Sequence, residues 1–594
     1  MRARLGALAL VLLTSSCGVP LKERGEELAN ACSSDDDCGS TGVCREDRCV
    51  STRASLPGLL LQIDLPAQSP YGAGTSSLVA VADDGVALQG RNDGGFSVSY
   101  DLAVPELVSI SNVRLQVSPV PPGCVAAEGD GSIPVSVQLH PAGQPVGLPL
   151  TVYSSRSTLV AEDEGEVYRC ALQVPAGTYD IYVTVDADAS GADPEEGCAL
   201  PPVLLTGHQL DTSNVSVDLS VGEPTVLTGS IIGLSDTLHL TGWTLELVEN
   251  KNGRPISTPW TFERRAGISP PGGFAVSYWP ELAEQAVIRL SPPDDADAIP
   301  TVLWLLDAVD LDGDQHVGLD LTALATATPV QIEGSVLDED AGTGVGATVT
   351  IQSHELLGGE FGANAAYRTT SDAGSTGRFD VALLPGTYKV IAQPGGAPDQ
   401  AVTEASWKIN QNDLGGGKTI VLHPKTSMVG TVQTAGGDPA FDVPAYLQPS
   451  ATPPLPYLDD VLSTYDVLPT NATALTDTEG VFAIPVDPGA FDLSIRPSDT
   501  SGFPWLVRAR VTIQPSTEPA TADLGALVVS NPVALTGAVV SPTGQRLGGA
   551  VIRAWVPVQD EAGEQAQSTV IQIGHAISDA AGSYSLLLPA SISQ

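Results

Sequence analysis

The chain has 594 residues, of which 42% are hydrophobic, so it is too long for one core and too apolar to stay unfolded. Its formal net charge of −43 comes from 27 basic and 70 acidic residues. This charge excludes nucleic acid and anionic lipid surfaces as partners, because their phosphates need Lys and Arg. We interpret the acidity as that of a soluble secreted protein, and the alternative is calcium bound in carboxylate-rich turns.

The first residues have the form of a secretory signal. Arg2 and Arg4 precede an apolar run over residues 5–13, which is far too short to cross a bilayer. Small polar residues then lead to Cys17. This order resembles a bacterial lipoprotein signal, although Thr14 stands where such signals usually carry Leu.

The resemblance implies that residues 1–17 are a lipoprotein signal peptide ending in a lipid-modified Cys17. The alternative is ordinary cleavage that leaves Cys17 as a free thiol, which is a liability in an oxidising compartment. Gly18 after the Cys implies the outer membrane of a diderm bacterium. The chain is therefore expected at the cell surface or in the periplasm, attached to the membrane by its N-terminus.

Residues 18–55 form a short Cys-rich segment and linker with too few apolar residues for a core. Four cysteines fall within 18 residues: Cys32, Cys38, Cys44 and Cys49. Secretion favours two disulfides, for which three connectivities are open. A zinc site is the alternative, but the paired CxxC spacing of such sites is missing. The segment resembles the Cys-rich stretches that follow the anchor in many bacterial surface lipoproteins.

One short phrase recurs along the rest of the chain. It consists of apolar residues around a Gly that is followed by a small residue, and its glycines are Gly229, Gly334, Gly430 and Gly537. The steps between them are 105, 96 and 107 residues, which is the length of a whole domain. The chain is thus expected to be a series of similar modules.

The copy after Gly334 shows the character of each module. Residues 347–351 alternate with period two, 379–383 form another apolar strand, and Pro385-Gly386 makes a turn before 388–392. Short alternating strands separated by turn residues predict an all-β chain of tandem antiparallel β-sandwiches of Ig-like or transthyretin-like type.

The phrases Gly334-Ser335-Val336, Ser371-Asp372 with Phe379, and Pro385-Gly386-Thr387-Tyr388 resemble the carboxypeptidase regulatory-like domain, a transthyretin-like sandwich of the carbohydrate-binding-like class. The resemblance implies a fold without a catalytic residue set. The predicted domains are 56–224, 225–329, 330–425, 426–530 and 531–594. The last stops before the strands that its sisters continue into, so we expect an incomplete sandwich.

The candidate sites for chemistry are few. Asp310, Asp312 and Asp314, with Asp320 nearby, have the spacing that opens a calcium loop, but the Gly and Glu of that loop are absent, so a solvated acidic turn is favoured. His354-Glu355 lacks the second His of a zinc protease. We therefore expect no cofactor and no enzymatic activity.

The predicted function is that of a non-enzymatic, lipid-anchored surface or periplasmic protein, whose sandwiches act as a scaffold, spacer or adhesion module with a glycan or protein ligand. One alternative is a carbohydrate-binding protein. Another is a hydrolase with its site in residues 56–224, the stretch least similar to the repeats.

Overall fold

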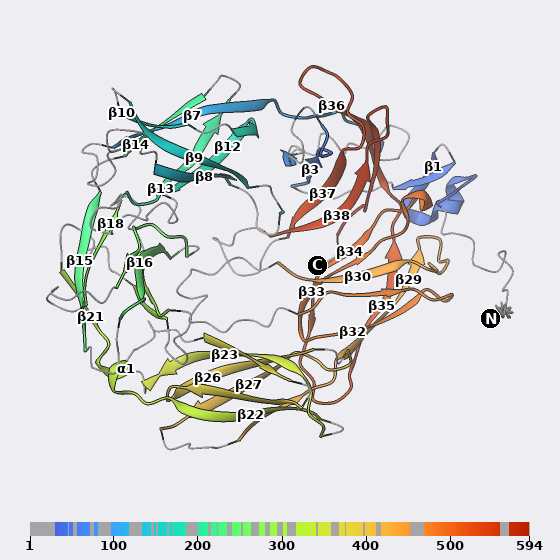
Figure 1. Ribbon diagram of the computed structural model, residues 1–594. Coiled ribbons are helices and arrows are strands. Elements are labelled where there is room, and N and C mark those ends of the chain that lie inside the picture. Colours follow the sequence, from blue (N-terminus) through green and yellow to red (C-terminus); the bar gives the residue numbers. More distant parts are fainter. Residues whose placement is uncertain are drawn as a thin grey trace, which may run out of the picture.

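The computed structural model is built almost wholly of β-strands, with one short α-helix, α1 (Thr322–Thr326), in the part that it describes (Figure 1). In those residues no helix has the length and apolar character needed to span a bilayer. The described residues are 30–45, 47–51, 56, 58–69, 71, 76–80, 97–117, 133–143, 148–149, 152–162, 165–169, 172–185, 200–211, 215–221, 224–233, 240–250, 253–262, 272–279, 286–293, 301–305, 316–339, 342–357, 368–374, 376–395, 398–411, 417–451, 469–558 and 569–592.

The sandwich of residues 330–422 shows the basic plan of the modules. Its strands are β22 (Val330–Asp338), β23 (Ala347–Leu356), β24 (Arg368–Ala373), β25 (Arg378–Leu383), β26 (Gly386–Pro394), β27 (Thr403–Ile409) and β28 (Lys418–Leu422). A three-stranded sheet, β25-β22-β28, faces a four-stranded sheet, β24-β23-β26-β27. All neighbours are antiparallel except β22 and β28, which are parallel. Burial alternates along β22, so one face of the strand packs into the core.

The same plan recurs on either side of this module. The preceding sandwich consists of β15 (Thr225–Ile232), β16 (Thr244–Glu249), β17 (Trp260–Thr261), β18 (Gly273–Tyr278), β19 (Ala286–Ser291), β20 (Val302–Leu305) and β21 (His316–Asp320). The following one consists of β29 (Thr426–Thr434), β30 (Pro444–Pro449), β31 (Ala472–Leu475), β32 (Val481–Val486), β33 (Gly489–Ile495), β34 (Leu506–Ile513) and β35 (Thr521–Val529). Each again pairs its first strand with its last in parallel.

Residues 107–221 carry a variant of this plan. The strands are β7 (Leu107–Val117), β8 (Ile133–Pro141), β9 (Tyr153–Glu162), β10 (Gly165–Arg169), β11 (Leu172–Pro175), β12 (Gly177–Val185), β13 (Val203–Leu210) and β14 (Val215–Val221). β7 pairs with β11 and, in parallel, with β14, while β9-β8-β12-β13 form the four-stranded part. The additional strand β10 joins β9 to β7, which fuses the two sheets.

The fifth sandwich is assembled from two distant parts of the chain. Residues 533–588 supply β36 (Val533–Val540), β37 (Val551–Val558), β38 (Thr569–Ile577) and β39 (Ser583–Leu588). Residues 60–103 supply β3 (Leu60–Asp64), β4 (Ser76–Ala80), β5 (Ser97–Ser99) and β6 (Leu102–Ala103). The sheets are β38-β37-β3-β4 and β39-β36-β5, with β6 also beside β36.

This closing sandwich corrects the boundary drawn through residues 56–224. β3 and β4 hold the places of β26 and β27, and β5 holds the place of β28, parallel to β36. The strands that residues 531–594 lack relative to their sisters are therefore supplied from the N-terminal side. Strand order within one segment could not show this, because the partners are separated by more than 400 residues.

Short junctions set the sandwiches in a closed ring (Figure 1). The linkers 104–106, 327–329, 423–425 and 530–532 each contain three residues between flanking elements. Buried side chains of the sandwiches at 225–329 and 330–422 belong to one continuous cluster, which includes Leu324 of α1. The modules are thus packed against one another and are not independent beads.

The Gly of the repeated phrase has a steric explanation. Gly334 lies directly across from Phe379 in the ladder between β22 and β25, and a Cβ placed on it would lie 2.1 Å from the ring. Phe274 takes the same place over Gly229, as does Phe482 over Gly430. A residue without a side chain is required because the aromatic ring of the neighbouring strand covers that position.

Candidate functional site

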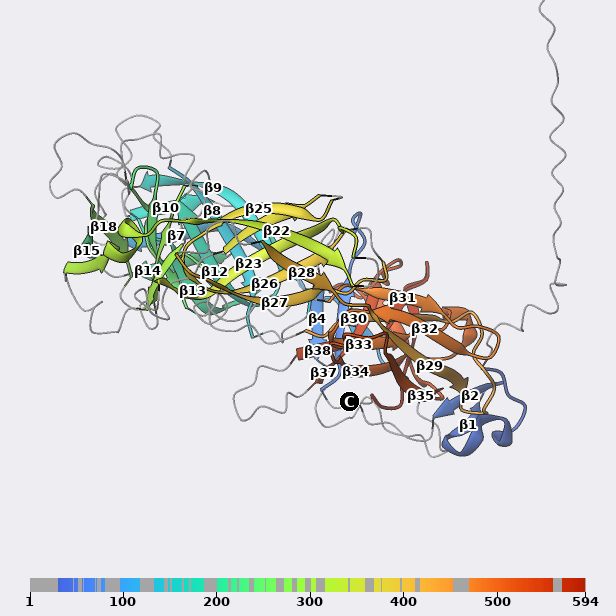
Figure 2. The ribbon, with the colours of Figure 1, turned by 90° about the horizontal axis from the view of Figure 1, so that it is seen from below.

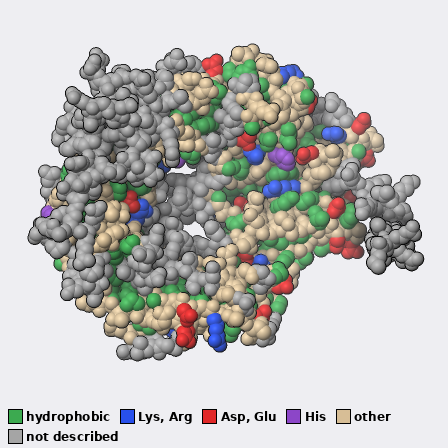
Figure 3. Space-filling view, in the orientation of Figure 1, with side chains coloured by type: hydrophobic (Ala, Val, Ile, Leu, Met, Phe, Trp, Pro, Cys, Tyr) green, Lys and Arg blue, Asp and Glu red, His purple; other side chains and the backbone are tan. Residues whose placement is uncertain are grey.

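The junction between the sandwich of residues 426–529 and the closing sandwich contains a cavity of about 450 Å³. Residues of both sandwiches form its walls: Pro444, Tyr446, Arg496, Pro497, Ser498, Asp499, Trp505, Arg553, Gln572 and His575. Figure 3 shows a His surface beside Lys or Arg surfaces on this side of the ring.

Arg496 is held between two aromatic rings at the wall of the cavity. Its guanidinium carbon lies 4.4 Å from the ring centre of Tyr446 and 4.2 Å from that of Trp505. Its Nε donates a hydrogen bond of 2.9 Å to the Ser494 hydroxyl. Burial lowers the pKa of Arg496, but an arginine keeps its charge at neutral pH. The stack fixes the plane of a cation whose remaining donors suit a carboxylate.

The opposite wall comes from the closing sandwich. The ring of His575, on β38, stands edge-on to Trp505 at 5.3 Å, and its Nε2 lies 3.9 Å from a carboxylate oxygen of Asp499. Arg553, on β37, pairs with Asp64 of β3. The cavity therefore draws its walls from both sandwiches, and one wall residue, Arg553, is paired with β3.

The structure joins the four N-terminal cysteines in two disulfides, Cys32–Cys44 and Cys38–Cys49. These bonds lie in a small knot that comprises a 3₁₀ helix, η1 (Asp35–Thr41), and the hairpin β1 (Gly42–Arg45) and β2 (Arg48–Ser51). Three of the sulfur atoms lie together as a metal site would place them, but all are consumed in the disulfides. The disulfide prediction is confirmed, and the zinc alternative is not.

The knot is docked on the same junction as the cavity. Asn30, which is buried, donates hydrogen bonds to the carbonyls of Cys49 and Gly502 at 2.8 and 2.9 Å. Asn531, also buried, donates to the Cys38 carbonyl at 2.7 Å. Gly502 follows the 3₁₀ helix η8 (Asp499–Ser501), whose Asp499 lines the cavity. In the turned view the knot lies at one extremity of the molecule (Figure 2).

Most of the other predicted site residues lie outside the described part of the chain. Cys17 is one of them, as are Asp310, Asp312 and Asp314. Asp320 is described, at the end of β21, where its carboxylate accepts a 2.8 Å hydrogen bond from the Thr322 amide. This contact with Thr322 lowers the pKa of Asp320. Calcium binding by the quartet thus stays a prediction.

The hydrolase alternative in residues 56–224 also stays a prediction. The contact shown for His140, on β8, is with an amide: its Nε2 lies 3.3 Å from the Gln138 side-chain oxygen. Burial lowers the pKa of His140. A His that contacts an amide is not arranged to activate a nucleophile, which requires the base beside a hydroxyl or thiol.

Sequence reasoning did not find the cavity. Trp505 is only 6% exposed, so it has the character of an ordinary core residue. Tyr446, Arg496 and Trp505 come from separate parts of one module and His575 from another, so no local motif joins them. The available signal was compositional: Arg is scarce in this chain, and two of its arginines meet here.

No protein-family model matches the chain, and none of the curated proteins is similar to it. Among solved structures, a streptococcal ancillary pilin has 12% identity and a TM-score of 0.19 over 54% of this chain and 99% of its own. GBS52, a minor pilin of Streptococcus agalactiae, has 12% identity and a TM-score of 0.20 over 34% and 96%. The TIE protein of Bacillus anthracis has 11% identity and a TM-score of 0.16, over 76% of this chain and 80% of its own.

Proposed function

We propose that the protein is a non-enzymatic scaffold of the bacterial surface or periplasm, held to the membrane by a lipid on Cys17. The observation that supports it is the closing sandwich, in which β3 to β6 complete the sheets of β36 to β39. A ring closed in this way keeps five modules in fixed relative positions. An extended spacer would instead leave the first and last modules far apart.

The interior of the closing sandwich supports a rigid role. Leu61, Ile63 and Leu102 are fully buried in one cluster with residues of β36 and β37. Burying each such side chain contributes roughly 1.5–3 kcal/mol. Trp555 donates a 3.0 Å hydrogen bond to Gln62, and both residues are buried. These contacts hold the ring closed without a covalent link.

Small-angle X-ray scattering of the full chain tests the scaffold. A closed ring predicts a compact particle with a short maximum dimension, and five sandwiches in an extended row would contradict it. Labelling with radioactive palmitate tests the anchor, with Cys17→Ala as the comparison. We expect label in the unaltered chain alone, and equal label in both would exclude a lipid on Cys17.

A second candidate function, carbohydrate binding, is favoured by the cavity at the junction. The ring faces of Tyr446 and Trp505 are stacked on Arg496. A ligand in the cavity would therefore meet a fixed cation, and these rings are not free to stack on a sugar. We infer that any sugar bound there carries an acidic group, which a guanidinium can hold by two parallel hydrogen bonds.

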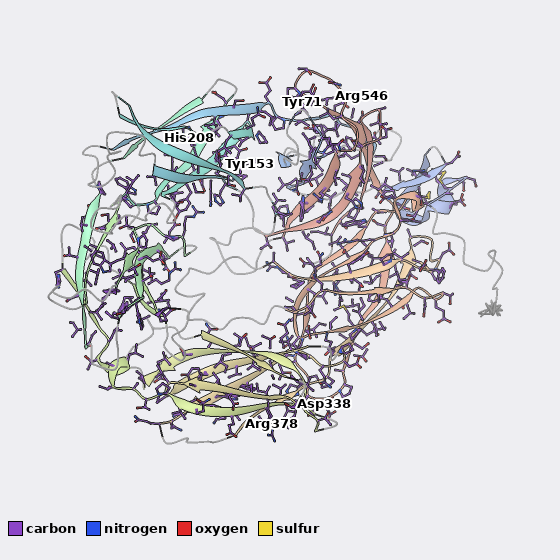
Figure 4. All side chains as sticks on the ribbon, viewed as in Figure 1. Tyr71, Tyr153, His208, Asp338, Arg378 and Arg546 are labelled. Atoms are coloured by element: carbon purple, nitrogen blue, oxygen red, sulfur yellow. A yellow bond between two sulfur atoms is a disulfide. The ribbon has the colours of Figure 1, made fainter. Side chains whose placement is uncertain are left out.

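A glycan array that includes uronic acids and neutral sugars tests this candidate. Arg496→Gln should abolish binding of the acidic glycans. Arg378→Gln should preserve it, because Arg378 is an exposed residue of β25 on a different sandwich (Figure 4). Binding that is unchanged by Arg496→Gln, or equal for neutral sugars, would contradict the assignment.

A further inference from the structure

Within the described part of the chain, the closing sandwich is the module that is built from two segments far apart in sequence. We propose that a second copy of this chain can supply the missing half, so that copies join head to tail. In this exchange residues 30–104 of one copy, here called the N-terminal segment, pair with residues 533–588 of the next. The inference goes beyond the scaffold function and does not depend on the lipid anchor.

The pairing is specific to the sequence of the N-terminal segment. The Tyr584 hydroxyl donates to the Tyr100 carbonyl at 2.7 Å, and Asp101 accepts from the Ala538 amide at 2.8 Å. Near the rim, the Tyr71 hydroxyl donates a 3.0 Å hydrogen bond to the Gln545 side-chain oxygen. None of these contacts requires that both partners belong to one chain. Another copy offers them unchanged.

An opened ring would also expose unpaired strand edges and apolar side chains of the closing sandwich. Without the N-terminal segment, β37 loses its β3 neighbour and β36 loses β5, so both strands present unpaired backbone groups. Leu535, Ile552 and Val556, now buried, would face water. Strands β3 and β5 already pair in register with β37 and β36 in the closed ring, so the same strands of another copy fit these edges and this apolar face. The expected occupant is therefore a second copy.

The rest of the molecule allows the exchange. Residues 105–106 are the short link from the N-terminal segment to β7, and opening there would release the knot and β3 to β6 together. The two docking asparagines would make the same bonds on the next copy. The interface joins different surfaces of identical chains, so it gives larger rings or filaments. At low concentration closure within one chain dominates, because its effective concentration is in the millimolar range.

Disulfide trapping between separately marked copies tests the proposal. Asp64 and Val551 face each other in the register of β3 and β37, and both are half-buried. Full-length Asp64→Cys and Val551→Cys chains are unfolded together in denaturant, refolded at high concentration and oxidised. We expect a covalent heterodimer of twice 61.1 kDa on a non-reducing gel. Each single variant refolded alone measures the background of dimers that form through the natural cysteines.

A matched pair within a continuous sandwich is the control. Thr348 and Gln393 face each other in the equivalent strands β23 and β26. Because that sandwich draws its strands from one chain, mixed Thr348→Cys and Gln393→Cys chains should form no heterodimer above background. A yield for Asp64→Cys with Val551→Cys no higher than this control would overturn the proposal.

Sedimentation of the unaltered chain gives a second measurement that needs no cysteine. After refolding at increasing concentration, exchange predicts species at multiples of 61.1 kDa that grow with concentration. A single species of 61.1 kDa at every concentration would overturn the proposal even if the cysteine variants fail to fold.

Discussion

Single residues show why the repeated phrase contains glycine. We expect Gly334→Ala to destabilise the sandwich of residues 330–422 by about 1–3 kcal/mol, the usual range for overpacking, because the new methyl would overlap the Phe379 ring. Denaturant unfolding measures the change. Gly374→Ala is the control, since a Cβ there meets nothing within 4 Å. Equal stability of the two variants would contradict the steric explanation.

The tyrosine at the junction of the first two modules predicts sensitivity to alkali. Burial raises the pKa of Tyr182 to about 12, and its hydroxyl donates a 2.8 Å hydrogen bond to the Pro255 carbonyl. An unfolded tyrosine ionises near pH 10, so the folded state retains a proton that the unfolded state loses. This contribution to stability is complete below pH 10 and is lost as the pH rises from about 10 to about 12.

Tyr182→Phe should therefore lose less stability than the unaltered chain between these pH values. Thermal unfolding across the range measures the difference. An identical pH dependence in both proteins would show that Tyr182 ionises in the folded state as it does in water. Burial also raises the pKa of Tyr179 and of Tyr584, so part of the alkaline loss should remain in the variant.

At the scale of residues, the sequence predicted the position of the repeated glycines but not their cause. The aromatic ring over each glycine comes from a strand much later in the chain, and only the register of β22 with β25 brings them together. The cavity escaped prediction for a similar reason. Its stacked Arg496 depends on contacts between strands, and single-sequence periodicity reports which face is buried but not what lies opposite.

Among the elements, the junction between β28 and β29 depends on one buried carboxylate. Asp487 is 1% exposed. It accepts hydrogen bonds from the Val402 amide and from the Thr470 amide and hydroxyl, at 3.1, 3.1 and 2.6 Å. Lys425 of the linker lies 3.7 Å away. The carboxylate thus joins two modules and the linker between them.

Asp487→Ala should cost roughly 2–4 kcal/mol, because it leaves buried donors and a nearby ammonium without their acceptor. We expect faster hydrogen exchange and protease cleavage at residues 423–425 in particular. Glu518→Ala, which removes an exposed carboxylate of the same module, should change neither. Cleavage that is equally slow in both variants would show that packing alone holds this junction.

The strands themselves were largely predictable from the sequence. Alternating apolar residues and the Pro-Gly turn at 385–386 predicted 379–383 and 388–392, which lie within β25 and β26. The parallel pairing of first and last strands was not predictable, since it joins residues 84 positions apart. The fusing strand β10 likewise depends on pairing with both β9 and β7.

For the whole molecule, the two-part sandwich predicts tolerance to circular permutation. A chain that begins at residue 107 and places residues 58–104 after residue 591 would order β3 to β6 behind β39, as β26 to β28 follow β25. We expect this permutant to fold with one cooperative closing module and similar thermal stability. A chain of residues 107–591 alone should expose apolar surface and aggregate. Aggregation of the permutant as well would contradict the pairing.

The ring could not be derived from the sequence. Tandem repeats predicted a row of modules, and the missing strands of residues 531–594 predicted an incomplete sandwich. Both expectations followed from treating neighbours in sequence as neighbours in space. The pairing of β3 with β37 depends instead on long-range complementarity, such as the buried contact of Gln62 with Trp555, which no local pattern reveals.

The closed ring also determines how the molecule withstands proteases that cut exposed loops. If a peptide bond in one linker is hydrolysed, the two pieces remain held by the shared closing module, so nothing is released. Release of a module would need cuts in two linkers. A linear row of modules would instead lose its distal modules after a single cut.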